Sequence, residues 1–215
     1  GATTPAHQDD DWFFTFFQPY RYMINRVPMY PCIGNHDTAE TEDHDDREQL
    51  FDNLYLRERL ASGEASGDAS IDPGLFYRFR YGRDIEFICL DTSKEGFFHG
   101  KRMFEYPRHW EWIERTLASA GAPWRLAFCH HPPFDAGPEH RNTDRMQPLL
   151  PLLQRGGTRA MFNGHEHNFQ HSSYQGIDYF VSGAGSKLQV EPPVDFASAH
   201  PVSCSDKAHC RLVTL

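Results

Sequence analysis

Three apolar segments of this 215-residue chain each end in a short polar cluster that contains histidine. The clusters are Gly34-Asn35-His36-Asp37, His130-His131 and Gly164-His165-Glu166-His167. The preceding runs end near Ile33, Cys129 and Phe162, and each has the composition of a strand. In layered α/β folds, functional side chains gather at the carboxyl ends of strands. The sequence therefore predicts an α/β fold in which the three clusters form one site.

The rest of the chain alternates between helical and strand-like patterns. Apolar spacing predicts helices over residues 12–26, 47–60, 107–120 and 145–154, and strands over 27–33, 75–81, 85–90, 124–129, 158–162 and 177–181. Residues 82–84 are expected to form a hairpin turn, and the Ser-, Gly- and Asp-rich stretch 61–72 a loop. Because the sequence has no internal repeat and no clear linker, we expect a single domain over residues 1–215.

The overall charge and hydropathy exclude several classes of protein. A formal net charge of −9 argues against nucleic acid as the main partner, because a phosphate backbone requires a basic surface. A small phosphorylated substrate remains compatible, because metal ions supply positive charge locally. No apolar run approaches the roughly 20 residues that cross a membrane, so no membrane partner is expected.

The five cysteines divide into two groups. Cys32, Cys89 and Cys129 lie in strand-like runs and are expected to be buried, inert thiols. Cys204 and Cys210 are close enough in sequence to close a small disulfide loop in an oxidising compartment. Their pairing and their staying reduced are both open.

Each histidine cluster has a chemical interpretation and a simpler structural one. Neutral imidazole is a common ligand for Zn, Fe and Mn, and Gly164 permits a backbone turn that would present His165 and His167 to metal ions. The Asn35 carbonyl oxygen would add a ligand without adding charge, and Asp37 would orient a proton-donating His36. Taken singly, the same residues also suit a surface pair, a connecting turn or a buried histidine bonded to backbone.

The order of the clusters is more informative than any one of them. Gly-Asn-His-Asp, His-His-Pro and Gly-His-x-His, in this order, resemble the calcineurin-like metallophosphoesterases. Within that superfamily the chain is similar to the purple, or tartrate-resistant, acid phosphatases. The most specific parts are residues 164–170 and 179–185, and Leu90-Asp91-Thr92 fits the same branch. The resemblance covers nearly the whole chain.

The resemblance implies a four-layer α/β/β/α sandwich and a role for each cluster residue. Two metal ions, Fe, Zn or Mn, would lie at the strand carboxyl ends. Asn35, His130 and His165 would bind one ion, and His167 would bind the other. His36 would be the catalytic group, with Asp37 behind it. His131 and Asn168 would lie in the outer shell or contact the substrate.

The implied activity is hydrolysis of phosphomonoesters by a metal-activated hydroxide. Phosphodiesters or cyclic nucleotides are the alternative substrates, because His-His-Pro-Pro also occurs in diesterase relatives.

The family's Asp-x-His and Gly-Asp-x-x-(Asp/Tyr/Asn) motifs are absent upstream of Gly34, so we expect the first part of the domain to lie outside this sequence. The apolar ending at residues 212–215 suggests an incomplete carboxyl end as well. If the natural chain began at Gly1, a non-catalytic metal-binding or interaction domain would be expected instead. The resemblance slightly favours an extracytoplasmic or secreted location.

Overall fold

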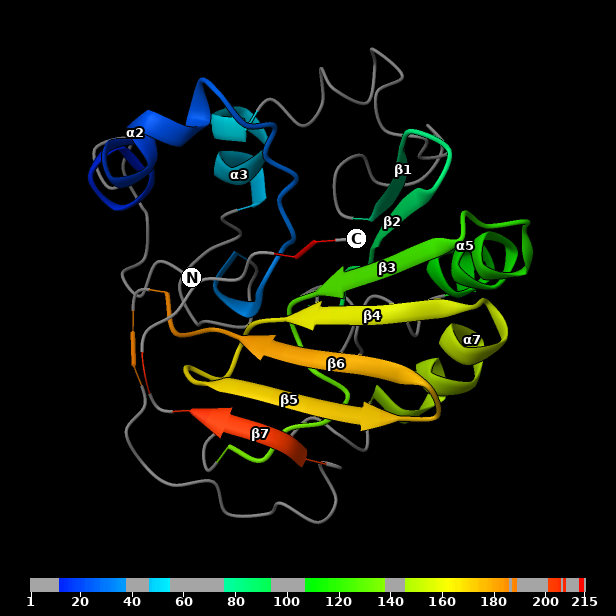
Figure 1. The fold of residues 1–215 in the computed structure, drawn as a ribbon. Helices are drawn as coiled ribbons and strands as arrows, with labels where there is room; N and C mark the ends of the chain where they lie inside the picture. Colours follow the sequence, from blue (N-terminus) through cyan, green and yellow to red (C-terminus); the bar gives the residue numbers. More distant parts are fainter. Residues whose placement is uncertain are drawn as a thin grey trace.

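Seven strands form one mixed sheet in the order β1-β2-β3-β4-β6-β5-β7 (Figure 1). The computed structural model describes residues 12–37, 47–54, 76–93, 107–137, 146–185, 187–188, 201–205, 207 and 213–214. The strands are β1 Tyr77–Tyr81, β2 Ile85–Cys89, β3 Trp124–Cys129, β4 Thr158–Asn163, β5 Phe169–Tyr174, β6 Ile177–Ser182 and β7 Pro201–Ser205. Strands β2, β3, β4 and β6 are parallel to their neighbours in that series, so their carboxyl ends lie at one edge of the sheet.

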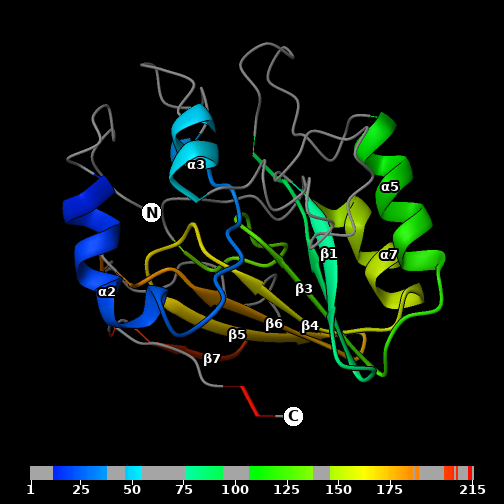
Figure 2. The ribbon, with the colours of Figure 1, turned by 90° about the horizontal axis from the view of Figure 1, so that it is seen from above.

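Helices lie on one face of the sheet and beyond its carboxyl edge. The helical segments are η1 Phe13–Phe17, α2 Gln18–Ile24, η2 Asn35–Asp37, α3 Arg47–Leu54, α5 Pro107–Ala118, η5 Gln147–Leu149 and α7 Leu150–Arg155. Helices α5 and α7 lie side by side against the sheet, and α2 and α3 lie at the end toward which β3 and β4 point (Figures 1 and 2). The main core is formed between α5, α7 and the sheet, where Ile113, Leu153 and Met161 are fully buried.

The predicted α/β class is confirmed, and most predicted helices are present. Helix α5 begins at Pro107, which has no N–H to leave unpaired in the first turn. Residues 13–24 are helical as expected, with a π-helical first part. The predicted helix 47–60 is present as far as Leu54, and its remainder lies outside the described residues, as does the loop 61–72. None of the helices in the described ranges is long and apolar enough to cross a membrane.

The predicted strand over residues 27–33 is wrong. This segment has no regular structure, because Pro28 and Pro31 provide no N–H for a strand ladder. It is fixed through carbonyl oxygens instead: the Tyr77 hydroxyl donates to the Pro31 oxygen at 2.6 Å. The segment therefore leads into Gly34 from beside β1 without being part of the sheet.

Two strands, β5 and β7, were not predicted. Strand β5 is polar at most positions, so it shows neither a buried run nor a clear alternation. Its hairpin with β6 uses the two-residue loop Gln175-Gly176, whose φ angles of 52° and 78° are those of a type I′ turn. The predicted hairpin between β1 and β2 is confirmed, with Gly82 at φ 63°.

A four-layer sandwich contains two sheets. The strands of the described residues all belong to one sheet, and α5 and α7 provide a helical layer on one of its faces. The second sheet of the implied sandwich therefore stays a prediction.

Gly157 offers a local test of the backbone path between α7 and β4. Its φ of 71° lies in the left-handed region, and an added Cβ would meet no atom within 4 Å. Gly157→Ala is therefore expected to lower the free energy of unfolding by about 1 kcal/mol through backbone strain alone. Urea unfolding measures this loss. Gly185→Ala, at an exposed glycine without a positive φ, should change stability by less than about 0.5 kcal/mol.

Candidate metal centre

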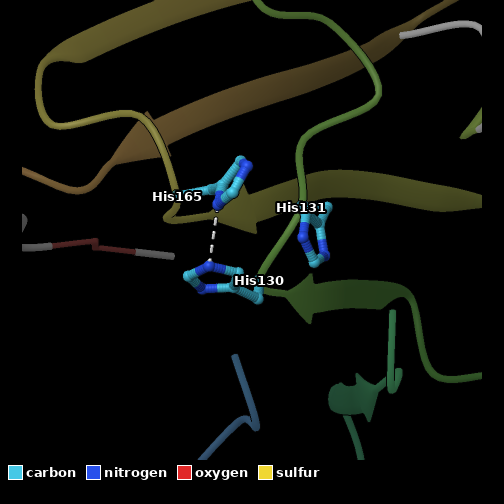
Figure 3. A group of neighbouring side chains, drawn as sticks. All are labelled: His130, His131 and His165. Atoms are coloured by element: carbon cyan, nitrogen blue, oxygen red, sulfur yellow. Dashed lines mark hydrogen bonds between the residues drawn. The ribbon is translucent and has the colours of Figure 1, made fainter. Parts of the chain in front are cut away.

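Asn35, His130 and His165 meet at the carboxyl edge of the sheet. His130 directly follows β3, and Gly164 separates His165 from the end of β4. Asn35 is the first residue of η2. The His130 Nε2 atom lies 2.7 Å from Asn35 Oδ1 and 3.0 Å from His165 Nδ1, and all three side chains are partly buried. Figure 3 shows the two imidazoles turned toward each other from neighbouring strand ends. The three residues that the resemblance assigns to one ion are thus brought together.

The chemistry of these three atoms fits a metal ion. A neutral imidazole nitrogen and an amide oxygen each present a lone pair, and a single ring N–H at His130 Nε2 cannot point fully at both neighbours. A cation between the three atoms would satisfy all of them at once. Nitrogen ligands with one neutral oxygen suit Zn, Fe or Mn.

Gly34 makes room for the His130 ring. A Cβ at residue 34 would lie 2.9 Å from His130 Nδ1, closer than real Cβ contacts, so a side chain here would displace the imidazole. The turn itself is held by Asp37, whose Oδ2 accepts a hydrogen bond from the Gly34 N–H at 2.8 Å. This bond fixes Asn35 in η2, whereas the predicted support of His36 by Asp37 stays a prediction.

The left-handed residue in the turn after β4 is His165, at φ 71°. Gly164, which the sequence indicated would permit a turn here, does not have a positive φ. Gly164 serves another purpose: its N–H donates to the His130 carbonyl oxygen at 3.0 Å. A left-handed histidine is uncommon, and such backbone strain is typical of functional sites.

His131 lies beside the other two imidazoles and is fully buried. Its ring centre is 4.4 Å from that of His165, and the three histidines offer ligand atoms that all lie within 4.8 Å of one another. His131 Nδ1 is 3.0 Å from the Thr92 hydroxyl oxygen, which also accepts a hydrogen bond from the His131 N–H at 3.1 Å. Thr92 thereby orients His131, a contact that the sequence did not indicate. Whether His131 contacts metal or substrate stays a prediction.

The remaining predicted site residues lie outside this histidine group. Within the described part of the chain, no carboxylate joins the group, and His167 is not a member of it. The His36 side chain is exposed on η2. Asn168 is buried; its Oδ1 accepts from Gln170 Nε2 at 3.0 Å, and its carbonyl oxygen accepts from the Gly183 N–H at 3.3 Å. The functional roles assigned to these three residues stay predictions.

The cysteines near the site are structural. Cys89 and Cys129 are fully buried, as predicted, and Cys32 is partly buried. Burial raises the pKa of the Cys89 and Cys129 thiols well above the usual cysteine value, so both stay protonated. The Cys129 thiol donates to the His131 carbonyl oxygen at 3.2 Å. The predicted pairing of Cys204 with Cys210 lies outside the described residues, because Cys210 does.

Several known proteins are similar to this chain. Residues 6–169 match the family model of the calcineurin-like phosphoesterases. The chain is 33% identical over 184 residues to tartrate-resistant acid phosphatase type 5 of Homo sapiens and 27% identical over 184 residues to that of Oryctolagus cuniculus; each alignment covers 76% of this chain and 50% of the relative. The chain thus spans about half the length of these relatives. A solved purple acid phosphatase from yellow lupin (Lupinus luteus) seeds is similar at a TM-score of 0.47 and 18% identity, over 62% of this chain and 27% of that one.

Proposed function

This chain belongs to the calcineurin-like phosphoesterase family, and from that premise we propose that it hydrolyses small phosphomonoesters with two bound metal ions. One observation carries the proposal: at the carboxyl edge of the sheet, His130 Nε2 lies 2.7 Å from Asn35 Oδ1 and 3.0 Å from His165 Nδ1. These atoms come from three segments far apart in the chain. Two imidazole nitrogens and one amide oxygen, all able to bind metal, therefore meet at one place.

In this proposal five of the cluster residues have defined tasks. Asn35, His130 and His165 hold one ion, and His167 contributes to the second. When bound, the ions would lower the pKa of a water molecule and neutralise the charge that develops on the phosphoryl oxygens. His36 would donate a proton to the leaving oxygen; its exposed side chain, next in sequence to Asn35, supports this role because a substrate can reach it.

Two further observations support a small phosphomonoester as substrate. The similar human and rabbit proteins are named acid phosphatases. The net charge of −9 disfavours a long polyanion, whereas a single phosphate group needs only the local charge of the ions.

Metal depletion and reloading test the proposal. The full-length natural protein is treated with a chelator, dialysed, reloaded separately with Zn²⁺, Mn²⁺ or Fe, and assayed on p-nitrophenyl phosphate and on bis(p-nitrophenyl) phosphate. We expect depletion to lower the rate by more than about tenfold, one of the ions to restore it, and the monoester to react faster. A faster diester would make the chain a phosphodiesterase. Bound metal with no hydrolysis of either ester would make it a non-catalytic metal-binding domain.

A further inference from the structure

Asn163 occupies the last position of β4, next to Gly164 and two residues before His165. The parallel ladder between β3 and β4 ends at the pair Cys129 and Asn163, so the strands separate directly beyond this residue. The side chain of Asn163 is buried, with 6% of the residue exposed. Its placement is unusual because it lies between the two turns that carry His130 and His165.

The Asn163 amide binds both residues that flank His130. Its Nδ2 atom donates to the Cys129 carbonyl oxygen and to the His131 carbonyl oxygen, each at 3.1 Å. The same nitrogen lies 3.1 Å from Cys129 Sγ. The carbonyl oxygen of His130 itself accepts from the Gly164 N–H at 3.0 Å. Three consecutive carbonyl groups on the β3 side are therefore held by two consecutive residues on the β4 side.

We infer that Asn163 is a positioning residue that sets the separation of His130 Nε2 and His165 Nδ1. The inference rests on the proposed function, since it concerns the same ligands. With the backbone on both sides of His130 tied to β4, the direction of the His130 side chain is fixed relative to the turn that starts at Gly164. The 3.0 Å approach of the two imidazole nitrogens follows from this connection.

Binding both carbonyl groups requires a side chain at position 163 that has the length of asparagine and two hydrogen-bond donors. The two hydrogens of an amide nitrogen match the two carbonyl oxygens, one for each. Leucine has a similar size and no donor, so it would fill the space and leave both carbonyl groups without this partner. Outer-shell bonds of this kind typically change metal affinity by about 10- to 100-fold.

Asn163→Leu and Asn163→Ala test the inference in the full chain, with Co²⁺ as the probe. Co²⁺ affinity is measured by titration calorimetry and by visible absorption, which reports ligand geometry. We expect both variants to bind Co²⁺ about 10- to 100-fold more weakly, with an altered absorption spectrum. In the metal-free protein, the amide hydrogen of Gly164 should exchange at least about tenfold faster than in the wild type.

Leu153→Ala serves as the control for general destabilisation. Leu153 is fully buried on α7, away from the turns, so its loss should lower stability while leaving Co²⁺ affinity and spectrum unchanged. Unchanged Co²⁺ affinity in both Asn163 variants would overturn the inference and leave the proposed function standing. A wild-type chain that binds no Co²⁺ would count against the proposed function. In that case the amide exchange of Gly164 in the Asn163 variants decides the positioning role. Exchange at the wild-type rate overturns this role, and faster exchange supports it.

Discussion

His165→Ala is expected to lower metal affinity by more than about 100-fold and to remove hydrolysis with it. The substitution removes His165 Nδ1, which lies 3.0 Å from His130 Nε2, and alanine offers no replacement ligand. Asn35→Ala should act in the same direction, because it removes the amide oxygen that lies 2.7 Å from His130 Nε2. Metal content after dialysis, measured by elemental analysis, and turnover of p-nitrophenyl phosphate report the two effects separately.

Two other histidine variants distinguish ligand loss from a general effect. His171→Ala removes an imidazole from β5, where His171 Nε2 contacts Asp178 Oδ1 at 2.8 Å outside the candidate site, and should leave metal content unchanged. His36→Ala should lower turnover more than metal content, because His36 is proposed to act on the leaving group. If His165→Ala kept full metal content and full activity, the ligand assignment would be wrong.

The three residues that meet at the candidate site were predictable from the sequence because their chemistry is local. Histidine and asparagine directly after apolar runs, and the order of the three clusters, indicate one site, and the family resemblance adds the ligand roles, which stay predictions. The contacts that shape the site were not predictable in this way. Position 34 must lack a side chain because a Cβ there would collide with the His130 ring, which is nearly 100 residues away in sequence. A Cβ at position 164 would make only an ordinary contact with the same ring. The bonds from Asn163 and Thr92 likewise join different strands.

The fold shows the same division between local and distant causes. Helix α5 and strands β3, β4 and β6 have strong periodic or apolar patterns, and each was predicted close to its observed limits. Residues 27–33 have the apolar composition of a strand, but their prolines cannot complete a ladder. The sequence of strand β5 has only a weak strand pattern. The strand forms because it pairs with β6 on one side and β7 on the other.

The buried ion pair of Arg125 and Glu86 holds the opposite end of the sheet. Both residues are 1% exposed, and Arg125 Nε lies 2.6 Å from Glu86 Oε2. The same guanidinium donates to the carbonyl oxygens of Leu117 at 3.0 Å, Ser119 at 3.0 Å and Gly156 at 2.6 Å. These carbonyl groups lie at the carboxyl ends of α5 and α7, where helical hydrogen bonds run out. One side chain of β3 therefore completes two helices and is the closest partner of a buried carboxylate, whose other oxygen lies 3.4 Å from Arg80 and 3.8 Å from Arg78.

Arg125→Met is accordingly expected to lower the free energy of unfolding by about 3 to 5 kcal/mol. The variant leaves the Glu86 carboxylate buried without its closest partner and removes the donor to three helix-end carbonyl groups. Urea unfolding followed by circular dichroism measures the loss. Arg159→Met, at an exposed arginine of β4, should change stability by no more than about 0.5 kcal/mol.

A double variant separates the charge from the helix ends. Adding Glu86→Leu to Arg125→Met removes the buried charge, so the double variant should be more stable than Arg125→Met alone. It should remain less stable than the wild type, because the carbonyl groups of α5 and α7 still lack the guanidinium. A double variant no more stable than Arg125→Met would show that the buried carboxylate left without Arg125 is not the source of the loss. The helix-end hydrogen bonds would then account for the whole effect.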